Sequence, residues 1–355
     1  MFVLDENVDL LSYSKKPNRE PNKSHAKKSD RKKKIIVLVS VILALAIVLM
    51  TSGIIYINSL LNNATKVDLD ADDLGVTENI FNNRDVINIA LFGIDTRTDS
   101  TKGRSDAVMI VSVDKKHNKI KLSSIARDSY VNIEGRGKDK LTHAYAYGGA
   151  QLAVKTINQN FDMNITDYVS VNFFGIVSII DEIGGVTIDV DSAEMAVMNK
   201  EYVTELNRIG IPCDAITKTG LQRLTGAQAL AYMRNRYTGG DLSRTDRQQE
   251  VISALFGEVK NINITKYPSI VKMGLSHVET TLTNTEILSL AVHVVTNSSS
   301  IDRLSLPTKE CNPQSGKNAY VNGVWYYIYD LDVAKQELQD FIKETGKYAA
   351  SEQEK

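Results

Sequence analysis

The sequence predicts a mixed α/β domain that follows a single membrane-spanning helix. From Val86 onward, strand-like and helix-like segments alternate to the end of the chain. An uncharged apolar run, Ile35 to Ile57, precedes them. The chain of 355 residues with 43% apolar content can bury one large core or two modest ones. The net charge of -1 gives no indication of nucleic-acid binding.

The first 34 residues are strongly basic, with ten Lys or Arg against five Asp or Glu. They are rich in Lys, Ser, Asn and Pro, and contain too few apolar side chains to fold alone. We expect residues 1–34 to form a basic tail that suits contact with anionic lipid.

The run of residues 35–57 is long enough to cross a hydrocarbon core of about 30 Å. The alternative is a cleaved signal peptide, which needs a shorter apolar run and a small-residue cleavage site, and neither is evident. Because the basic residues precede the run, the positive-inside rule places the tail in the cytoplasm and residues 58–355 outside.

The rest of the chain divides into three parts by composition. Residues 58–85, rich in Asn and Asp, are expected to form a stalk, residues 86–343 the domain, and residues 344–355 a flexible tail. The two cysteines, Cys213 and Cys311, would lie in an oxidising or thiol-poor space. A disulfide and two separate thiols both remain open.

The first three strands bring charged residues to one sheet edge. Residues 86–92 form a continuous apolar run that suits a strand buried on both faces, and Asp95 leaves its end. Residues 107–113 and 120–126 are predicted as an antiparallel hairpin with Val113 opposite Ile120. That register places Asp106 across from Arg127.

Helices and strands alternate through the rest of the domain. Helical periodicity covers residues 150–160 and residues 173–183, and the second helix stops at Gly184-Gly185 before a strand at 186–190. Capping-box patterns at Thr225–Gln228, and more loosely at Ser243–Asp246, predict two further helices. The last elements are a helix at 285–295, a strand at 301–306 and a helix at 331–342.

Arginines gather around these helix ends. Arg244 and Gln248 continue the apolar face of the helix 244–259, so they point into a partly enclosed space, while Arg247 lies off that face and a solvated position remains open for it. If the backbone there is extended, the side chains of Arg234 and Arg236 point to the same side. The alternative is that both arginines are exposed on a loop. Clustered arginines need an anion, and guanidinium groups bind phosphate bidentately.

Two aspartates are the candidate metal ligands. Asp95 and Asp106 both leave strand ends, and carboxylates with phosphate oxygens are the usual ligands of Mg²⁺ (or Mn²⁺). Asp106 can also pair with Arg127, and the two roles are compatible. His143 is isolated from other histidines, which favours a core or capping role over catalysis. Phosphate-loop, dinucleotide-binding, nucleophile-elbow and zinc-helix motifs are all absent from the sequence.

Several of these segments together resemble one family, the LytR-CpsA-Psr proteins of the bacterial cell envelope. The likeness covers residues 86–262 and keeps motif order and spacing. One departure is Ala126, where the family usually has proline, and we expect it to loosen the turn while leaving Arg127 in place. The matching segments are Asn88-Ile-Ala-Leu-Phe-Gly-Ile-Asp-Thr-Arg97, Gly103-Arg-Ser-Asp106, Ser124-Ile-Ala-Arg-Asp128, Lys140-Leu-Thr-His-Ala-Tyr145, Gly184-Gly-Val186, Leu224-Thr-Gly-Ala-Gln-Ala-Leu-Ala-Tyr-Met-Arg234 and Arg244-Thr-Asp-Arg-Gln-Gln249.

The resemblance implies a three-layer α/β/α domain around a mixed sheet, outside the cytoplasmic membrane of a Gram-positive bacterium. It implies transfer of a teichoic acid, capsule or other wall glycan from undecaprenyl pyrophosphate to a peptidoglycan hydroxyl. Asp95 and Asp106 would hold the metal and, with Arg127, take part in catalysis. Residues 173–180 and the preceding strand are candidate walls of a prenyl tunnel, with ordinary core as the alternative. The pyrophosphate would be held by Arg97, Arg104, Arg127, Arg234, Arg236, Arg244 and Gln248.

Two other functions fit parts of the sequence. A prenyl-pyrophosphate phosphohydrolase would use the same site with water as acceptor. A membrane-anchored signalling or transcription-attenuating protein is the second alternative, but the cytoplasmic tail has no helix-turn-helix and little apolar content. The expected partners are membrane lipid, the lipid-linked glycan and peptidoglycan, without nucleic acid, and the sequence predicts no oligomeric state.

Overall fold

The computed structural model describes residues 23–76, 86–95, 103–296, 300–311 and 319–349. The chain divides into two compact units, Met1–Tyr56 and Ile57–Lys355. Helix α1 (Lys23–Leu61) contains the predicted apolar run, and Ile42–Leu61 is long and apolar enough to cross a membrane. Its apolar side chains are exposed, for example Leu49 at 73% and Met50 at 70%, as expected for a helix that lipid surrounds.

The second unit is built on one mixed sheet of seven strands in the order β1-β10-β7-β2-β3-β4-β11. The central strand β2 pairs in parallel with β7 and antiparallel with β3, which pairs antiparallel with β4. Strand β11 lies parallel to β4 at one end, and β10 and β1 complete the other. The strands are β1 (Thr65–Lys66), β2 (Val86–Asp95), β3 (Arg104–Asp114), β4 (Lys119–Ile125), β7 (Asp167–Asn172), β10 (Val278–Thr280) and β11 (Ser300–Leu306).

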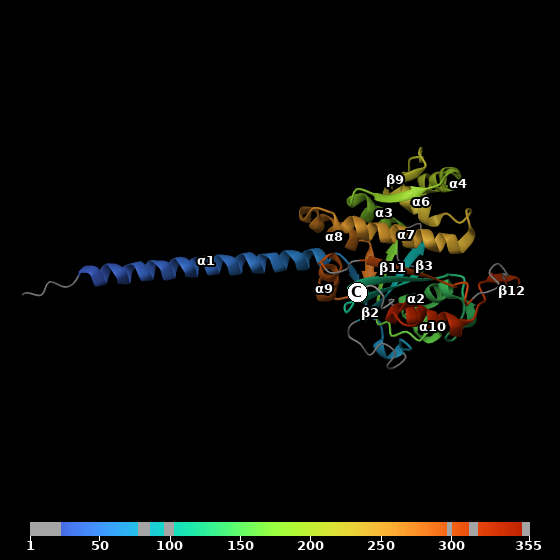
Figure 1. Cartoon of the computed structure of the whole chain (residues 1–355), viewed down its shortest axis with the longest axis horizontal. Helices are drawn as coiled ribbons and strands as arrows, with labels where there is room; N and C mark the ends of the chain where they lie inside the picture. Colours follow the sequence, from blue (N-terminus) through green and yellow to red (C-terminus); the bar gives the residue numbers. More distant parts are fainter. Residues whose placement is uncertain (1–22, 77–85, 96–102, 297–299, 312–318, 350–355) are drawn as a thin grey trace, which may run out of the picture. The chain divides into compact units, whose positions relative to one another are not determined.

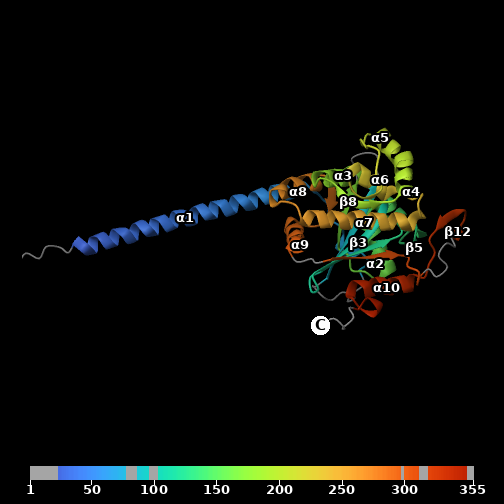
Figure 2. The same cartoon turned by 45° about the horizontal axis from the view of Figure 1, so that its top comes forward.

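Helices cover both faces of this sheet, which confirms the three-layer α/β/α fold. Both views show α2 and α10 on one face and α3, α6 and α7 on the other (Figures 1 and 2). The helices of the two layers are α2 (Leu141–Phe161), α10 (Leu331–Lys343), α3 (Phe173–Glu182), α6 (Gly226–Arg234) and α7 (Gly240–Lys260).

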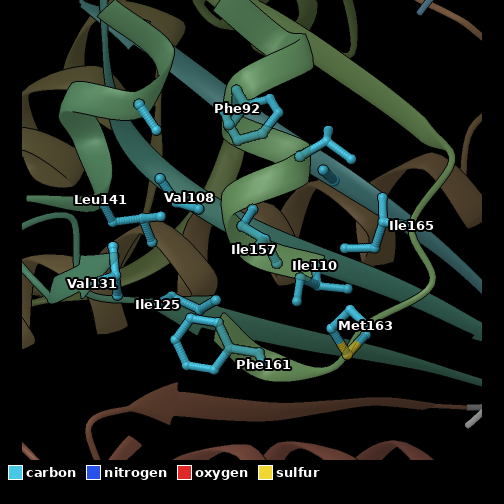
Figure 3. Packing of buried hydrophobic residues seen from close by; sticks show 14 of the residues in the cluster. Phe92, Val108, Ile110, Ile125, Val131, Leu141, Ile157, Phe161, Met163 and Ile165 are labelled. Carbon is cyan, nitrogen blue, oxygen red and sulfur yellow. The ribbon is translucent and has the colours of Figure 1, made fainter. Parts of the chain in front are cut away.

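Alternating side chains of the strands feed two separate cores. Val108 and Ile110 of β3 join the core under α2 and α10, together with Phe92 of β2 (Figure 3). Met109, between them in sequence, joins the core under α3, α6 and α7. This period of two is what a sheet covered on both faces requires, and it explains why the consecutive residues Val108–Val111 of β3 are all apolar.

Smaller elements surround the two layers. Three two-stranded pairs lie outside the main sheet, and short helices follow β8 and precede β10. The strand pairs are β5 (Tyr130–Ile133) with β6 (Gly137–Lys140), β8 (Val186–Val190) with β9 (Gly220–Leu224), and β12 (Ala319–Val321) with β13 (Val324–Tyr326). The short helices are α4 (Ser192–Val197), η2 (Met198–Val203), α5 (Thr204–Arg208), η3 (Ile264–Lys266) and α8 (Tyr267–Leu275).

Most predicted elements are present, with differences at helix starts. Thr225 and Gln228 form the predicted capping box of α6. The looser pattern at Ser243–Asp246 is wrong as a helix start, because α7 begins at Gly240 and Ser243 donates to Gly239 O inside the helix. The helix predicted over 150–160 begins earlier, at Leu141, and its backbone is non-helical at Gly148 and Gly149.

The folded domain includes residues that the sequence assigned to a stalk and a tail. Thr65–Lys66 adds a strand to the sheet beside β10, and Leu74 is 1% exposed in the core under α2. At the other end, Glu344 pairs with Lys119 at 2.7 Å, and the Tyr348 ring packs edge-to-face against Phe341. Short polar segments are difficult to assign from composition because a single buried leucine can anchor them.

The two cysteines are free in this structure. Cys213 packs in the core under α3, α6 and α7, and Cys311 in the core under α2 and α10. Burial raises the pKa of the Cys213 thiol to about 11, so the thiol is unreactive at neutral pH. Of the two possibilities left open by the sequence, the structure has separate thiols.

Candidate functional site

Charged side chains from distant parts of the second unit line one polar cavity of about 270 Å³. The ends of β2 and β4 and the start of β3 supply Asp95, Arg127 and Asp106. The remaining lining residues come from α3, α6 and α7, from the loop between α6 and α7, and from η2 and α5. They are Phe173, Glu201, Tyr202, Glu205, Arg234, Arg236, Tyr237, Arg244 and Gln248.

The predicted hairpin places one ion pair at this edge. Val113 lies opposite Ile120, and Arg127 Nη1 donates to Asp106 Oδ1 at 2.7 Å. Both side chains keep about a fifth of their surface exposed to the cavity side, at 20% and 21%. The pairing predicted from register is therefore confirmed, and the pair remains accessible to a ligand.

Hydrogen bonds hold the turn that carries Arg127, although it lacks the family proline. Ala126 N donates to Leu306 O at 2.9 Å, and Ser129 Oγ donates to Ala126 O at 2.7 Å. Proline has no N–H and could not make the first of these bonds. The expected loosening of the turn is wrong, because the alanine extends the pairing between β4 and β11.

A buried carboxylate next to this turn holds two cations in place. Asp128 is 4% exposed and contacts Arg127 Nε at 3.4 Å and Lys140 Nζ at 2.8 Å. Burial alone would raise the pKa of Asp128, but the hydrogen bond from Lys140 and the charge of Arg127 lower it below its ordinary value. The ionised carboxylate fixes the base of the Arg127 side chain.

The C-terminal end of α6 supplies two more arginines. Arg234 lies over the Phe173 ring at 4.8 Å and pairs with Glu205 at 3.2 Å. Its Nη1 is buried without a hydrogen-bond partner among the described residues. Arg236, two residues on, is exposed beyond the helix end. A buried guanidinium nitrogen that lacks a partner at a cavity wall is suited to an anionic oxygen.

The first turns of α7 separate ligand-facing from structural side chains. Arg244 and Gln248 are buried in the protein and line the cavity, as their position on the helix face predicted. Arg247 is also buried, so a solvated position for it is excluded. It donates to Glu194 Oε1 at 2.7 Å, Asn235 O at 2.8 Å and Thr238 O at 2.8 Å.

Sequence reasoning missed the acidic and aromatic wall. Glu201 and Tyr202 belong to η2, a π-helical turn, and Glu205 to α5. Neither element has a hydrophobic period long enough to be recognised in the sequence. A π-helical turn often marks a functional site, but it is visible only in coordinates.

Among the other predicted or considered residues, two lie outside the cavity lining and one cannot be placed. Arg97 is outside the described residues. Arg104 pairs with Asp95 in the β2–β3 register, but its side chain is exposed and does not line the cavity. His143 Nδ1 contacts Asp139 Oδ2 at 2.8 Å within α2 and β6, away from the lining residues, in keeping with the structural role favoured by the sequence.

Opposite charges balance among the described lining residues. Four arginines (127, 234, 236 and 244) face four carboxylates (Asp95, Asp106, Glu201 and Glu205). Such a cavity would bind a diphosphate poorly by net charge alone. A divalent cation held by Asp95 and Asp106 would restore a positive balance, and two carboxylates beside open polar space are suitable hard ligands for it.

A second, narrow pocket of about 60 Å³ adjoins the charged cavity and is almost entirely apolar. It shares Asp106, Phe173, Arg234 and Gln248 with that cavity and continues between the sheet and α3. Gly93 permits the narrow passage, since a Cβ there would lie 2.9 Å from Ala107 Cβ. The predicted tunnel wall of β7 and α3 lines it through Val171, Phe173 and Ile176.

Comparison with known proteins identifies the family. The sequence model that describes the LytR_cpsA_psr family matches residues 53–343 of this chain. The chain belongs to the LytR_cpsA_psr family. The match extends on both sides of residues 86–262, in agreement with the strand and helices found there.

Relatives of this family member are named transferases. The chain is 33% identical over 270 residues to the polyisoprenyl-teichoic acid–peptidoglycan teichoic acid transferase TagU of Oceanobacillus iheyensis, covering 74% of this chain and 77% of TagU. It is 30% identical over 334 residues to the corresponding transferase TagT of Bacillus subtilis, covering 90% and 98%. These names confirm the predicted enzyme class.

Solved structures share the fold. TagT bound to LI-WTA superposes with a TM-score of 0.61 at 28% identity, covering 78% of this chain and 99% of that one. TagT with bound octaprenyl pyrophosphate lipid gives a TM-score of 0.58 at 27% identity, with the same coverage. A structural relative therefore binds a prenyl pyrophosphate.

Proposed function

We propose that this chain transfers a teichoic acid or related wall glycan from undecaprenyl pyrophosphate to a peptidoglycan sugar hydroxyl. The observation that carries the proposal is the junction of two pockets. Arginines line the polar one, and the adjoining one is apolar and shares Arg234 and Gln248 with it. A diphosphate with a prenyl chain has the same division into charged and apolar parts.

The guanidinium groups would bind and orient the diphosphate. Arg127, Arg234 and Arg244 approach the cavity from different elements, so they can bind oxygens on different sides of the two phosphates. Their positive charge favours a transition state in which negative charge grows on the leaving phosphate. Ion pairs with Asp128 at 3.4 Å and with Glu205 at 3.2 Å help to keep Arg127 and Arg234 oriented before the ligand arrives.

The reaction is a phosphoryl transfer. The acceptor hydroxyl oxygen attacks the phosphorus that bears the glycan, and a phosphodiester bond forms. The bond from that phosphorus to the bridging oxygen breaks, and its electron pair leaves with prenyl phosphate. Asp95 or Asp106 would take the hydroxyl proton, since both carboxylates line the cavity.

Asp95 and Asp106 would also hold Mg²⁺ or Mn²⁺. The ion, when bound, would supply positive charge to the diphosphate oxygens. The charge balance of the cavity supports this part of the proposal.

The membrane arrangement follows from the basic N-terminus. The tail would lie in the cytoplasm, α1 would cross the membrane once, and the domain would lie outside, where peptidoglycan is found. The diphosphate supplies the driving free energy, so the reaction needs no ATP.

The test is transfer by the purified full-length chain in detergent. A prenyl-pyrophosphate-linked glycan and peptidoglycan fragments are supplied with Mg²⁺ or with a chelator, and the covalent adduct is measured by mass spectrometry. We expect an adduct with metal only. Arg127→Ala should lower the rate by about 10² to 10³, the usual effect of losing one charge-stabilising donor.

A matched control is Arg223→Ala. Arg223 pairs with Glu258 on the β9 side, is 47% exposed and lies outside the cavity lining, so its loss should leave the rate unchanged. Free glycan phosphate without adduct would instead support the phosphohydrolase. Metal-independent transfer would contradict the metal proposal, and full activity of Arg127→Ala would contradict the site.

A further inference from the structure

Helix α9 (Asn284–Thr296) presents an apolar stripe to solvent. Leu288 is 42% exposed, Val292 53% and Val295 37%. Their spacing of i, i+4 and i+7 places the three side chains on one face of the helix.

The opposite side of α9 is also apolar. Ile287, Leu290 and Val294 are half-buried there, and no described residue of the helix is fully buried. A helix that is apolar on both sides normally lies inside a protein or a membrane. The domain covers one side, and the exposed stripe therefore indicates a second apolar environment.

The start of α9 lies beside the end of the segment that can cross a membrane. Ile42–Leu61 is the segment that can cross a membrane, and Asn62 follows it directly. Asn284 Nδ2, in the first turn of α9, donates to Asn62 Oδ1 at 2.7 Å. Leu61 is 4% exposed, so the chain is fixed to the domain at the same point.

Two backbone contacts strengthen this link. Strand β1 pairs in parallel with β10, and Val67 N donates to Thr280 O at 3.1 Å. Only Thr281–Thr283 separate β10 from α9. The start of α9 is thus held within a few residues of the end of the membrane-spanning segment, within one compact unit.

We propose that α9 is an interfacial helix, with its Leu288–Val292–Val295 stripe inserted into the outer leaflet of the bilayer that α1 spans. A helix of this kind buries its apolar face by about 5–10 Å at the boundary of headgroups and acyl chains. With α1 it gives the domain a second attachment, so the domain is held against the lipid surface. The inference rests on the proposed membrane arrangement and not on the transfer reaction.

The test places a fluorescent label on the stripe. Val292→Cys is introduced into the full-length chain, which is reconstituted into phosphatidylcholine–phosphatidylglycerol vesicles and labelled with an environment-sensitive thiol dye. The native cysteines are 7% and 1% exposed, and the unsubstituted chain measures their background labelling. Quenching by lipids that carry a nitroxide on the acyl chain then reports contact with the leaflet.

The matched control is Leu221→Cys on β9, an exposed apolar position at 76% exposure. We expect the Val292 label to be quenched several-fold more than the Leu221 label. Equal quenching at the two positions would overturn the proposal. A disulfide between Val292→Cys residues of two chains, formed without lipid quenching, would also overturn it and assign the stripe to a second copy.

Discussion

At the scale of single residues, arginines close together in the sequence have different roles. The burial of each side chain and its hydrogen-bond partners distinguish these roles. Arg247 satisfies Glu194 and two backbone carbonyls, whereas Arg236 is exposed at the rim of the cavity. The sequence left a solvated position open for Arg247, because the partners that bury it lie 53, 12 and 9 residues away.

Replacing these two arginines should affect different properties, stability for Arg247 and activity for Arg236. Arg247→Ala leaves Glu194 buried without its cation, and we expect the free energy of unfolding to fall by about 3–5 kcal/mol. Arg236→Ala removes an exposed side chain, so stability should change by no more than about 0.5 kcal/mol, while kcat/KM for the lipid donor falls. Thermal unfolding and steady-state kinetics check both. A stable Arg247→Ala variant would show that its contacts are dispensable.

Asp128 should make the stability depend on pH. Its folded pKa is lowered, so the unfolded chain binds its proton more readily, and its contribution is present above the unfolded pKa of about 3.9. It is lost as the pH falls through the folded value. Asp128→Asn should cost about 2–4 kcal/mol at pH 7, since the buried carboxylate holds Lys140 and Arg127.

The difference in unfolding free energy between Asp128→Asn and the unsubstituted chain is measured from pH 7 down to pH 3. We expect it to shrink toward the acid end. A difference that stays constant over this range would mean that the carboxylate charge contributes nothing.

At the scale of elements, the contact of α3 with α6 sets the width of the apolar pocket. Gly226 begins α6, and a Cβ there would lie 2.2 Å from Val177 O of α3. The two helices carry Phe173 and Arg234, which lie at the junction of the two pockets. A glycine at this point allows their close approach.

Gly226→Ala should therefore separate the two helices. We expect a loss of about 1–3 kcal/mol from overpacking, together with lower transfer activity. Gly257→Ala in α7 is the control, because its Cβ would meet no atom within 4 Å. In a helix interior that change should leave stability equal or raise it by up to about 1 kcal/mol. Similar melting temperatures for the two variants would contradict this account.

At the scale of the whole molecule, the residues of the proposed site all lie in the unit Ile57–Lys355, so we expect the activity not to need the basic tail. Deleting residues 1–31 keeps Lys32–Lys34 and the anchor. We expect the amount of polymer covalently attached to purified cell wall to be unchanged, whereas a signalling function of the tail would be lost. Reduced attachment by a variant that still inserts into the membrane would contradict this prediction.

The sequence alone determined the central strands, the apolar helix near the N-terminus, and the arginines and aspartates that line the charged cavity. Mainly apolar runs specify strands buried on both faces, and the turn between two such runs sets a register that brings Asp106 to Arg127. The uncharged run near the N-terminus is recognised, by its length and composition, as a helix that can cross a membrane. These features are local, so one stretch of chain contains all the information.

Only the tertiary structure decided the rest. Glu201 and Tyr202 of η2 and Glu205 of α5 reach the cavity through short helices, of which η2 packs against α6. Tertiary packing also decides that Thr65–Lys66 pairs with β10 and that one face of α9 is exposed. These outcomes depend on contacts between residues far apart in the chain, and the free energy of such contacts leaves no periodic signal in the sequence.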